Sequence, residues 1–210
     1  MKSSNFAQTN EIRMEKITYR NATQEDAAFV AMAVAEAVGN TLMERMEAGK
    51  LTAKDKKLLA QIETACRRID TLYSWCHTHL ATTTEGIPVG ALVAYRGEGY
   101  LERRARTFSL LSNLITFDTE TMDAETKDGE YYLDSLAVLP QWRGMGIARH
   151  LLKHAQQEAH RYGRPAILAC APENLGAKRL YESLGFKEEG RMYIFGEDYL
   201  RMVSPSGTSS

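Results

Sequence analysis

Two short stretches of the chain combine residue types and spacings that suit anion binding and proton transfer. The first is VLPQWRGMGIARHLL, residues 138–152, in which an apolar run ends at Pro140 and an arginine and two glycines follow. Glycines between a strand and a helix let successive backbone N–H groups point into one concavity, and the helix adds its positive N-terminal end. The stretch therefore predicts an anion-binding loop, with a plain tight turn as the simpler alternative.

Two common nucleotide-binding loops do not fit this stretch. A dinucleotide loop would need a third glycine where Arg149 stands, and the apolar run PAILACA, residues 165–171, does not end in a ribose-binding acid. A Walker-type phosphate loop needs Gly-Lys followed by Ser or Thr, which this stretch lacks. The sequence therefore argues against both kinds of nucleotide site.

The second stretch is NLGAKRLYESLGF, residues 174–186, in which Gly185 is placed to end a helix and Phe186 to begin a strand. It follows the motif Arg143-x-x-Gly146-x-Ala148 in the chain, with an apolar strand between them. With these two motifs, the chain resembles the GNAT superfamily of acyl-CoA N-acyltransferases over residues 131–203. The resemblance implies an α/β fold with a mostly antiparallel mixed sheet, splayed central strands and flanking helices.

The resemblance also implies a binding site for acetyl-CoA as cosubstrate, without a metal. The pantetheine arm would pair with the main chain of Leu136, Ala137 and Val138 and accept a hydrogen bond from Asn174. The pyrophosphate would lie on a loop made of Arg143, Gly144, Met145, Gly146, Ile147 and Ala148. Tyr181 would protonate the departing thiolate as a general acid, although an aromatic side chain packed on the sheet is the alternative.

The general base is marked less clearly. In several members of the family a glutamate near the start of the pantetheine-binding strand takes the proton of the amine, and the corresponding residue here is Tyr132. Asp134 lies two residues on, on the same strand face, and is the first candidate. Glu130 and a water relay are the other two, and either carboxylate could equally be a solvated group at the rim.

The elements that must position these residues follow from apolar periodicity and turn residues. Helical spacing predicts helices over 25–38, 51–69, 100–115, 148–162 and 174–184, the first two with Thr23 and Thr52 as N-caps. Strands are predicted over 16–23, 131–139, 165–171, 186–195 and 198–203, and a hairpin over 77–97 turns at Glu85-Gly86.

This order of elements predicts one domain over residues 15–203, with flexible tails at 1–14 and 204–210. A helical insert at about 24–73 is expected to shape the acceptor site. The segment at about 117–130 carries six acids and predicts a mobile, solvent-facing loop, with a lid that attracts a cationic amine as the alternative. The basic run at 102–106 predicts a solvated helix face, with a contact to the 3′-phosphate of the coenzyme left open.

Composition excludes several classes of protein. The 210 residues carry a net charge of −1, which gives no electrostatic case for binding nucleic acid or an anionic membrane. No stretch approaches the ~20 apolar residues of a membrane span. Three scattered cysteines form no disulfide framework and favour a cytoplasmic location.

Two groups of reactive side chains predict little chemistry of their own. Cys170 lies in an apolar strand and is expected to be a small buried hydrophobe rather than an acyl carrier. His77 and His79 share a strand face, but a zinc site needs a partner cluster that the sequence does not reveal, so no metal is expected.

We therefore expect an N-acetyltransferase in which the amine attacks acetyl-CoA directly in a ternary complex. A small-molecule amine is the first choice of acceptor, and a peptide or protein amine is the second. A module of the same fold that binds acyl-CoA without turnover is the competing hypothesis, because position 132 lacks an acid. A domain that keeps only the fold is a third, against which the intact glycine loop argues. The sequence leaves a homodimer open.

Overall fold

The computed structural model describes residues 16–37, 42–113 and 118–206. In these ranges the strands are β1 Thr18–Asn21, β2 Thr78–Thr82, β3 Pro88–Arg96, β4 Tyr131–Val138, β5 Ala166–Cys170, β6 Lys187–Ile194 and β7 Glu197–Ser204. The α-helices are α2 Ala27–Ala37, α3 Leu42–Glu47, α4 Ala53–Cys66, α5 Tyr100–Leu111, α6 Ile147–Arg161 and α7 Leu175–Glu182. The predicted tail at 1–14 lies outside the described residues, whereas Ser204 is the last residue of β7.

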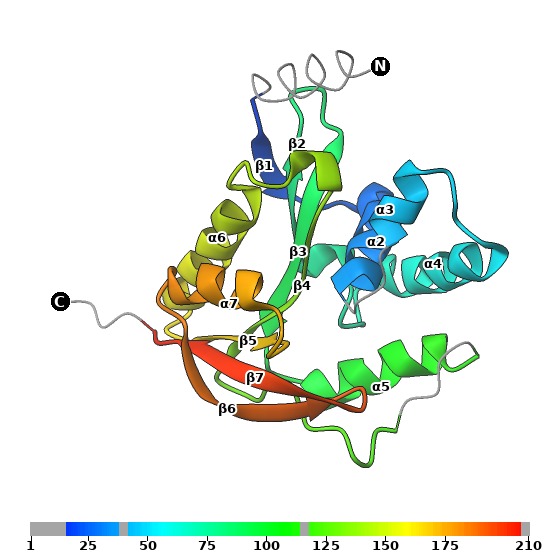
Figure 1. Ribbon diagram of the computed structural model, residues 1–210. Helices are drawn as coiled ribbons and strands as arrows, with labels where there is room; N and C mark the ends of the chain where they lie inside the picture. Colours follow the sequence, from blue (N-terminus) through cyan, green and yellow to red (C-terminus); the bar gives the residue numbers. More distant parts are fainter. Residues whose placement is uncertain (1–15, 38–41, 114–117, 207–210) are drawn as a thin grey trace.

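The described strands form one sheet in the order β1-β2-β3-β4-β5-β7-β6. Neighbouring strands are antiparallel at every pairing except between β4 and β5, which are parallel. This arrangement confirms the predicted mixed, mostly antiparallel sheet. The parallel pair lies in the middle of the sheet, and helix α6 makes the crossover between its two strands (Figure 1).

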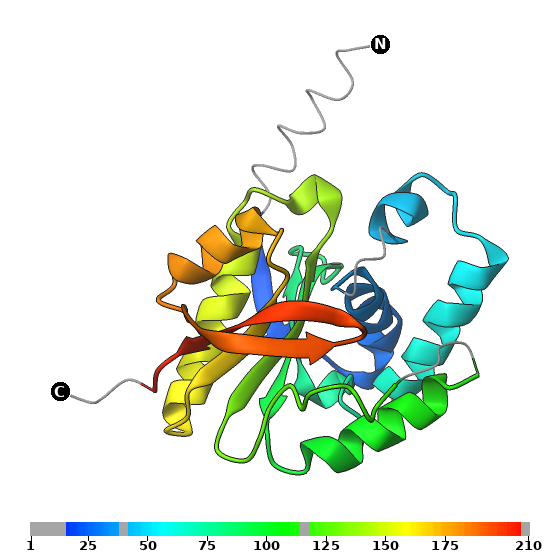
Figure 2. The ribbon, with the colours of Figure 1, turned by 60° about the horizontal axis from the view of Figure 1, so that its bottom comes forward.

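Helices cover both faces of the sheet. Figures 1 and 2 show α6 and α7 on one face and α2, α3 and α4 on the other. Helix α6 faces the sheet with an apolar stripe at helical spacing, and the buried members of that stripe are Ile147, Leu151, Leu152, Ala155 and Ala159. Burial of this stripe fixes the helix against the strands and therefore fixes the glycine loop that precedes it.

Local sequence signals place most helix ends correctly. Thr52 caps α4 as predicted, because its hydroxyl accepts from the backbone N–H of Asp55 while the Asp55 carboxylate accepts from the backbone N–H of Thr52. The predicted insert is helical: α2 and α4 lie within the predicted helices at 25–38 and 51–69, and the short helix α3 between them was not anticipated. No helix among the described residues is long and apolar enough to cross a bilayer.

The segment after α5 differs from the predicted solvent-facing loop. The relative solvent exposures of Glu125 and Glu130 are only 8% and 6%, whereas Asp118, Glu120 and Asp123 are exposed as predicted. The burial of the Glu130 carboxylate is compensated by Arg201 of β7, which donates to its Oε1 at 2.6 Å. The hydroxyls of two tyrosines compensate the burial of Glu125, as described below. Part of the acidic segment therefore belongs to the interior.

Candidate active site

A gap opens between the parallel strands β4 and β5. Their ladder contains only the pairs Tyr131↔Ala166 and Tyr132↔Ile167, although both strands continue beyond them. On its other edge, β4 remains paired with β3 as far as Val138. The main chain of Leu136, Ala137 and Val138 therefore has a strand partner on one edge only, as the splayed strands of the predicted fold require.

A β-bulge explains why β4 bends away from β5. Val93 pairs with Ser135 and Ala94 pairs with Leu133, so Asp134 is an extra residue on β4. A bulge of this kind bends its strand and redirects the side chain at that point. Asp134 is thereby brought to the wall of the cavity that the separating strands enclose.

This cavity has a volume of about 630 Å³ and is lined mainly by strands β4, β5 and β7, helix α7, and the end of α2. Four predicted site residues, Asp134, Leu136, Asn174 and Tyr181, line it. All the charged side chains in its wall are acids, namely Glu36, Asp134, Glu173 and Glu197. The cavity therefore suits a neutral arm along its strands and a cation near its carboxylates.

The glycine loop forms a second hollow of about 240 Å³ at the beginning of α6. Gly144 and Gly146 have φ angles of +78° and +80°, a conformation that glycine adopts without strain. A Cβ atom added at either glycine would have no neighbour within 4 Å, so protein packing does not require these glycines. Met145 packs against the core and Ile147 is buried within it.

Arg143 makes its contacts with the insert and with β4. Its guanidinium pairs with Glu36 at 3.1 Å and with Glu44 at 3.4 Å, and its Nε donates to the carbonyl of Val138 at 3.0 Å. Ala148 lies in the first turn of α6 and lines the same hollow as Arg143. The loop is thus held to helices α2 and α3 through a single arginine.

Tyr181 lies on α7 with its ring edge against Phe186, at 6.1 Å between ring centroids. Burial raises the pKa of Tyr181 to about 12, so the phenol keeps its proton at neutral pH, as a proton donor must. Asn174 caps α7, because its Oδ1 accepts from the backbone N–H of Ala177 at 3.0 Å. The amide nitrogen of Asn174 donates to no described residue and remains available to a ligand.

Cys170 is 3% exposed, which confirms the predicted burial. It also borders the cavity. Burial raises the pKa of its thiol, so the side chain is protonated at neutral pH. A protonated thiol is a weak nucleophile. The environment of Cys170 therefore favours packing over acyl transfer.

Behind Asp134 lies a cluster of carboxylates and phenols that the sequence did not reveal. Tyr95 donates to Oδ2 of Asp134 at 2.5 Å, and Ser135 donates to Oδ1 at 2.7 Å. Glu125 accepts from Tyr132 at 2.8 Å through Oε2 and from Tyr100 at 2.9 Å through Oε1. Both carboxylates are thus held by hydrogen bonds in a largely apolar setting.

The two carboxylates have perturbed acidity. Burial raises the pKa of Asp134, although the hydrogen bonds from Tyr95 and Ser135 act in the opposite direction. Burial also raises the pKa of Glu125, and the negative charge of Asp134 raises it further. Carboxylates with raised pKa values are stronger bases than exposed ones. Asp134 lines the cavity and Glu125 does not, so Asp134 is the member of the pair that can meet an amine.

Position 132 is occupied by a tyrosine, and its hydroxyl donates to an acid from the preceding segment, Glu125. Glu125 is only seven residues before Tyr132, but no local pattern distinguishes it from its exposed acidic neighbours. The one available signal is Met122, an apolar residue within the acidic segment that is 8% exposed. Glu130, the other candidate base, is paired with Arg201 and is absent from the cavity wall.

The fold is shared with known acetyltransferases. A crystal structure of an acetyltransferase matches with a TM-score of 0.69 and 24% identity, covering 90% of this chain and 100% of the other. An N-acetyltransferase from Staphylococcus aureus Mu50 matches with a TM-score of 0.70 and 23% identity, covering 89% and 99%. The NatC complex bound to Gag peptide and CoA matches with a TM-score of 0.52 and 19% identity, covering 90% and 98%.

The sequence comparisons give the family. A search of curated proteins found no match. The family model described as the acetyltransferase (GNAT) family matches residues 61–186, which is more than half of the chain. That range includes the separating strands, the glycine loop and the helix that carries Tyr181. The chain therefore belongs to the GNAT family of acetyltransferases, as the two sequence motifs indicated.

Proposed function

We propose that this protein transfers the acetyl group of acetyl-CoA to the primary amine of a small, cationic molecule. The observation that carries the proposal is the shared cavity, in which the phenol of Tyr181 and the carboxylate of Asp134 line one space between β4 and β5. A proton donor for a leaving thiolate and a proton acceptor for an attacking amine are the two groups that aminolysis of a thioester needs.

The residues around the cavity suit the parts of coenzyme A. The free edge of β4 at residues 136–138 would pair with the amides of the pantetheine arm, and the amide nitrogen of Asn174 would add a hydrogen bond. The backbone N–H groups of the loop at 143–148 and the beginning of α6 would hold the pyrophosphate. Because Arg143 is already paired with Glu36 and Glu44, the main chain rather than the guanidinium is the primary phosphate contact.

The reaction follows as one direct transfer. The amine nitrogen attacks the carbonyl carbon of the thioester, a C–N bond forms, and the C–S bond breaks. Asp134 takes the proton that the amine loses, directly or through a water, and Tyr181 gives its proton to the departing sulfur. Main-chain groups near Val138 polarise the carbonyl oxygen, where negative charge develops in the transition state. The products are an N-acetyl amide and free coenzyme A.

The acceptor class follows from charge and enclosure. The charged residues in the cavity wall are all carboxylates, and the three besides Glu36, which pairs with Arg143, favour a cationic amine over a neutral or acidic one. Glu36 and Ala37, at the end of α2, close one side of the cavity. A wall supplied by the insert limits the space for an extended chain, so we favour a small amine over a peptide.

A thiol-release assay tests this proposal. Acetyl-CoA is mixed with the protein and with matched panels of small polyamines, neutral amines and short peptides, and free coenzyme A is measured against time. We expect turnover to be fastest with the small cationic amines and to fall as salt concentration rises. Preference for peptides would contradict the acceptor class. Binding of acetyl-CoA with no turnover on any panel would favour a module that binds the coenzyme without catalysis.

A further inference from the structure

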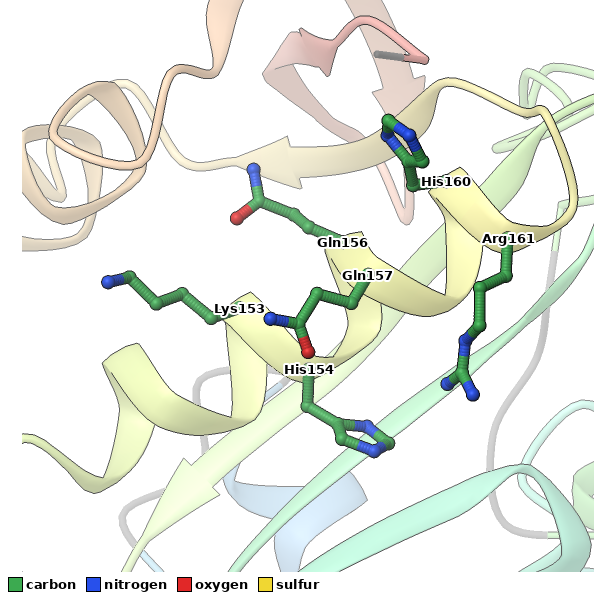
Figure 3. Close-up of a pocket in the computed structure, with 6 residues that line it drawn as sticks. All are labelled: Lys153, His154, Gln156, Gln157, His160 and Arg161. Atoms are coloured by element: carbon green, nitrogen blue, oxygen red, sulfur yellow. The ribbon is translucent and has the colours of Figure 1, made fainter. Parts of the chain in front are cut away.

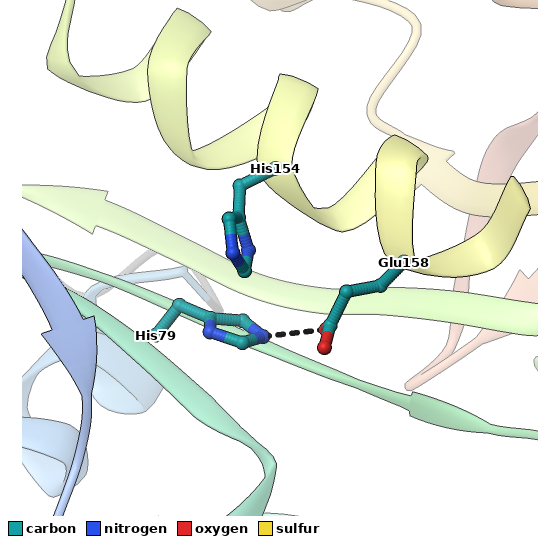
Figure 4. A group of neighbouring side chains, drawn as sticks. All are labelled: His79, His154 and Glu158. Carbon is teal, nitrogen blue, oxygen red and sulfur yellow. Dashed lines mark hydrogen bonds and ion pairs between the residues drawn. The ribbon is translucent and has the colours of Figure 1, made fainter. Parts of the chain in front are cut away.

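Three side chains with metal-binding atoms meet where α6 packs on β2. His79 projects from β2, and His154 and Glu158 project toward it from α6 (Figure 4). His154 and Glu158 are four residues apart and share one helix face. One nitrogen of each imidazole and one carboxylate oxygen of Glu158 all lie within 4.8 Å of one another.

The distances between the side-chain atoms of this His79–His154–Glu158 cluster can be compared with the distances between the ligand atoms of a zinc ion. Nε2 of His79 lies 2.8 Å from Oε2 of Glu158, and the two imidazole rings are edge-on, with centroids 4.5 Å apart. Zinc ligands at about 2.0–2.2 Å from the ion are separated from one another by roughly 3.4 Å in tetrahedral geometry. An ion bound between them would therefore take the place of the hydrogen bond between His79 and Glu158.

A second observation points to a missing ligand. Nδ1 of His154 is buried and has no hydrogen-bond partner among the described residues. A buried polar atom of this kind needs a partner, which in native proteins is commonly a water or an ion. The sequence provided only His77 and His79 as neighbours, whereas the fold gives His79 two different partners 75 or more positions away.

Neighbouring side chains orient the carboxylate of Glu158, and His154 borders an open hollow. Tyr131 donates to Oε2 of Glu158 at 2.7 Å, an outer hydrogen bond of the kind that orients metal ligands. Arg161 approaches Oε1 of Glu158 only to 3.7 Å, and its side chain is 67% exposed. An open hollow of about 800 Å³ along α6 has His154 in its wall (Figure 3).

We propose that His79, His154 and Glu158 bind one Zn²⁺ ion, with a water molecule in the fourth position. Two imidazoles and one carboxylate are a ligand set that suits this ion. None of the three residues lines the cavity between β4 and β5, so the ion would not take part in acetyl transfer. It would join β2 to α6, the helix that begins at the glycine loop. By binding only the folded state, it would stabilise the fold.

Calorimetry on the untagged full chain, freed of metal with a chelator, tests the site with ZnCl₂ as the titrant. We expect binding of one equivalent and a rise in melting temperature that grows with zinc concentration. Co²⁺ should give the visible absorption of a four-coordinate ion. His154→Asn and Glu158→Gln should each weaken Zn²⁺ affinity by about tenfold or more, the loss typical even of outer-shell changes. His160→Asn, on the same helix but outside the cluster, should leave affinity unchanged.

Several results would overturn the proposal. They are the absence of stoichiometric Zn²⁺ binding to the folded protein, an affinity that neither variant changes, and a loss of binding in His160→Asn that His154→Asn does not reproduce. Glu158→Gln also removes the partner of His79 and Tyr131, so its fold is checked by melting in chelator. If Glu158→Gln does not fold, His154→Asn alone tests the site. The Nδ1 atom of His154 has no hydrogen bond to lose among the described residues.

Discussion

The hydroxyl of Tyr132 on β4 donates to Oε2 of Glu125 at 2.8 Å, and this bond ties the acidic segment after α5 to the central strand. Tyr100, at the beginning of α5, holds the other oxygen of Glu125 at 2.9 Å. A buried carboxyl group thus stands behind Asp134, and the negative charge of Asp134 raises the pKa of this Glu125 carboxyl. We infer that the two acids act as one proton-accepting unit, of which Asp134 is the member that contacts the amine.

The pH dependence of kcat/KM should report this pair. A carboxylate base must be ionised, so activity falls as the pH falls through its pKa. Two neighbouring carboxylates oppose each other's ionisation, so loss of the Glu125 carboxyl in Glu125→Gln should move the acid limb of the profile to lower pH. Asp134→Asn should lower kcat/KM by about 100-fold. Both profiles are measured with the same cationic amine.

Glu120→Gln is the matched control, because Glu120 is an exposed acid in the same segment. Its profile should coincide with that of the unmodified protein. An acid limb that Glu125→Gln leaves in place would show that Glu125 has no influence on the base. Unchanged turnover in Asp134→Asn would leave a water relay as the route of the proton.

The proposed role of Tyr181 as general acid predicts a selective loss in turnover. Tyr181→Phe removes only the hydroxyl, so kcat should fall by about 100-fold or more while the affinity for acetyl-CoA changes little. The pKa of about 12 places the proton on this phenol throughout the neutral range. Rapid quench of a single turnover separates the chemical step from the release of products.

Tyr199→Phe serves as the comparison, since Tyr199 lines the same cavity but belongs to β7. Its hydroxyl donates to Glu197 at 3.3 Å, at the outer part of the molecule. An equal loss in both variants would indicate that the cavity, rather than the Tyr181 proton, was disturbed.

Much of the fold follows from signals that are local in the sequence. The strand at 131–139, the helix that begins near 148, and the strand at 165–171 each occupy the predicted place within a few residues. Their apolar periodicity, glycines and caps act over a few positions, so they can be read before any contact is known. The 6 residues of α3 are too few to show such a period, so this helix was not predictable in this way.

The remaining parts of the site depend on contacts that periodicity does not encode. The separation of β4 from β5 depends on the bulge at Asp134, which becomes visible only in the pairing with β3. Glu125 has the same charge and neighbours as the exposed acids around it, and its burial depends on two tyrosines from other elements. His79 meets Glu158 across 79 positions of sequence, and no short motif connects them.

Direct transfer predicts that Cys170 is dispensable for turnover. Its thiol is protonated because burial raises its pKa, and its Sγ lies 3.5 Å from the carbonyl oxygen of Ala171. Cys170→Ala should therefore keep kcat within a few-fold, with a modest loss of stability of about 1 kcal/mol from the lost side-chain packing. Mass spectrometry of the protein with acetyl-CoA alone should find no acetylated cysteine. An acetyl adduct that disappears in Cys170→Ala, together with lost turnover, would support an acyl-enzyme route instead.

The pyrophosphate site proposed at the glycine loop predicts different outcomes for two similar glycine substitutions. Gly146 before α6 and Gly163 after it have φ angles of +80° and +65°, and neither has a neighbour within 4 Å of an added Cβ. Alanine in this conformation costs roughly 1–2 kcal/mol, so Gly146→Ala and Gly163→Ala should lower stability by similar amounts. Only Gly146→Ala places a methyl group in the hollow proposed for the pyrophosphate, and it should weaken acetyl-CoA binding by about tenfold or more.

S-acetylpantetheine, which lacks the pyrophosphate, separates that effect from a general distortion of the site. Gly146→Ala should lose kcat/KM with acetyl-CoA and retain it with S-acetylpantetheine, whereas Gly163→Ala should retain both. The comparison works because the loop contacts only the phosphate end of the cosubstrate in the proposed mode, and the acetyl group lies near Asp134 and Tyr181. Equal losses with the two donors would mean that the loop acts on the cavity between β4 and β5, and the assignment of the pyrophosphate to residues 143–148 would then be wrong.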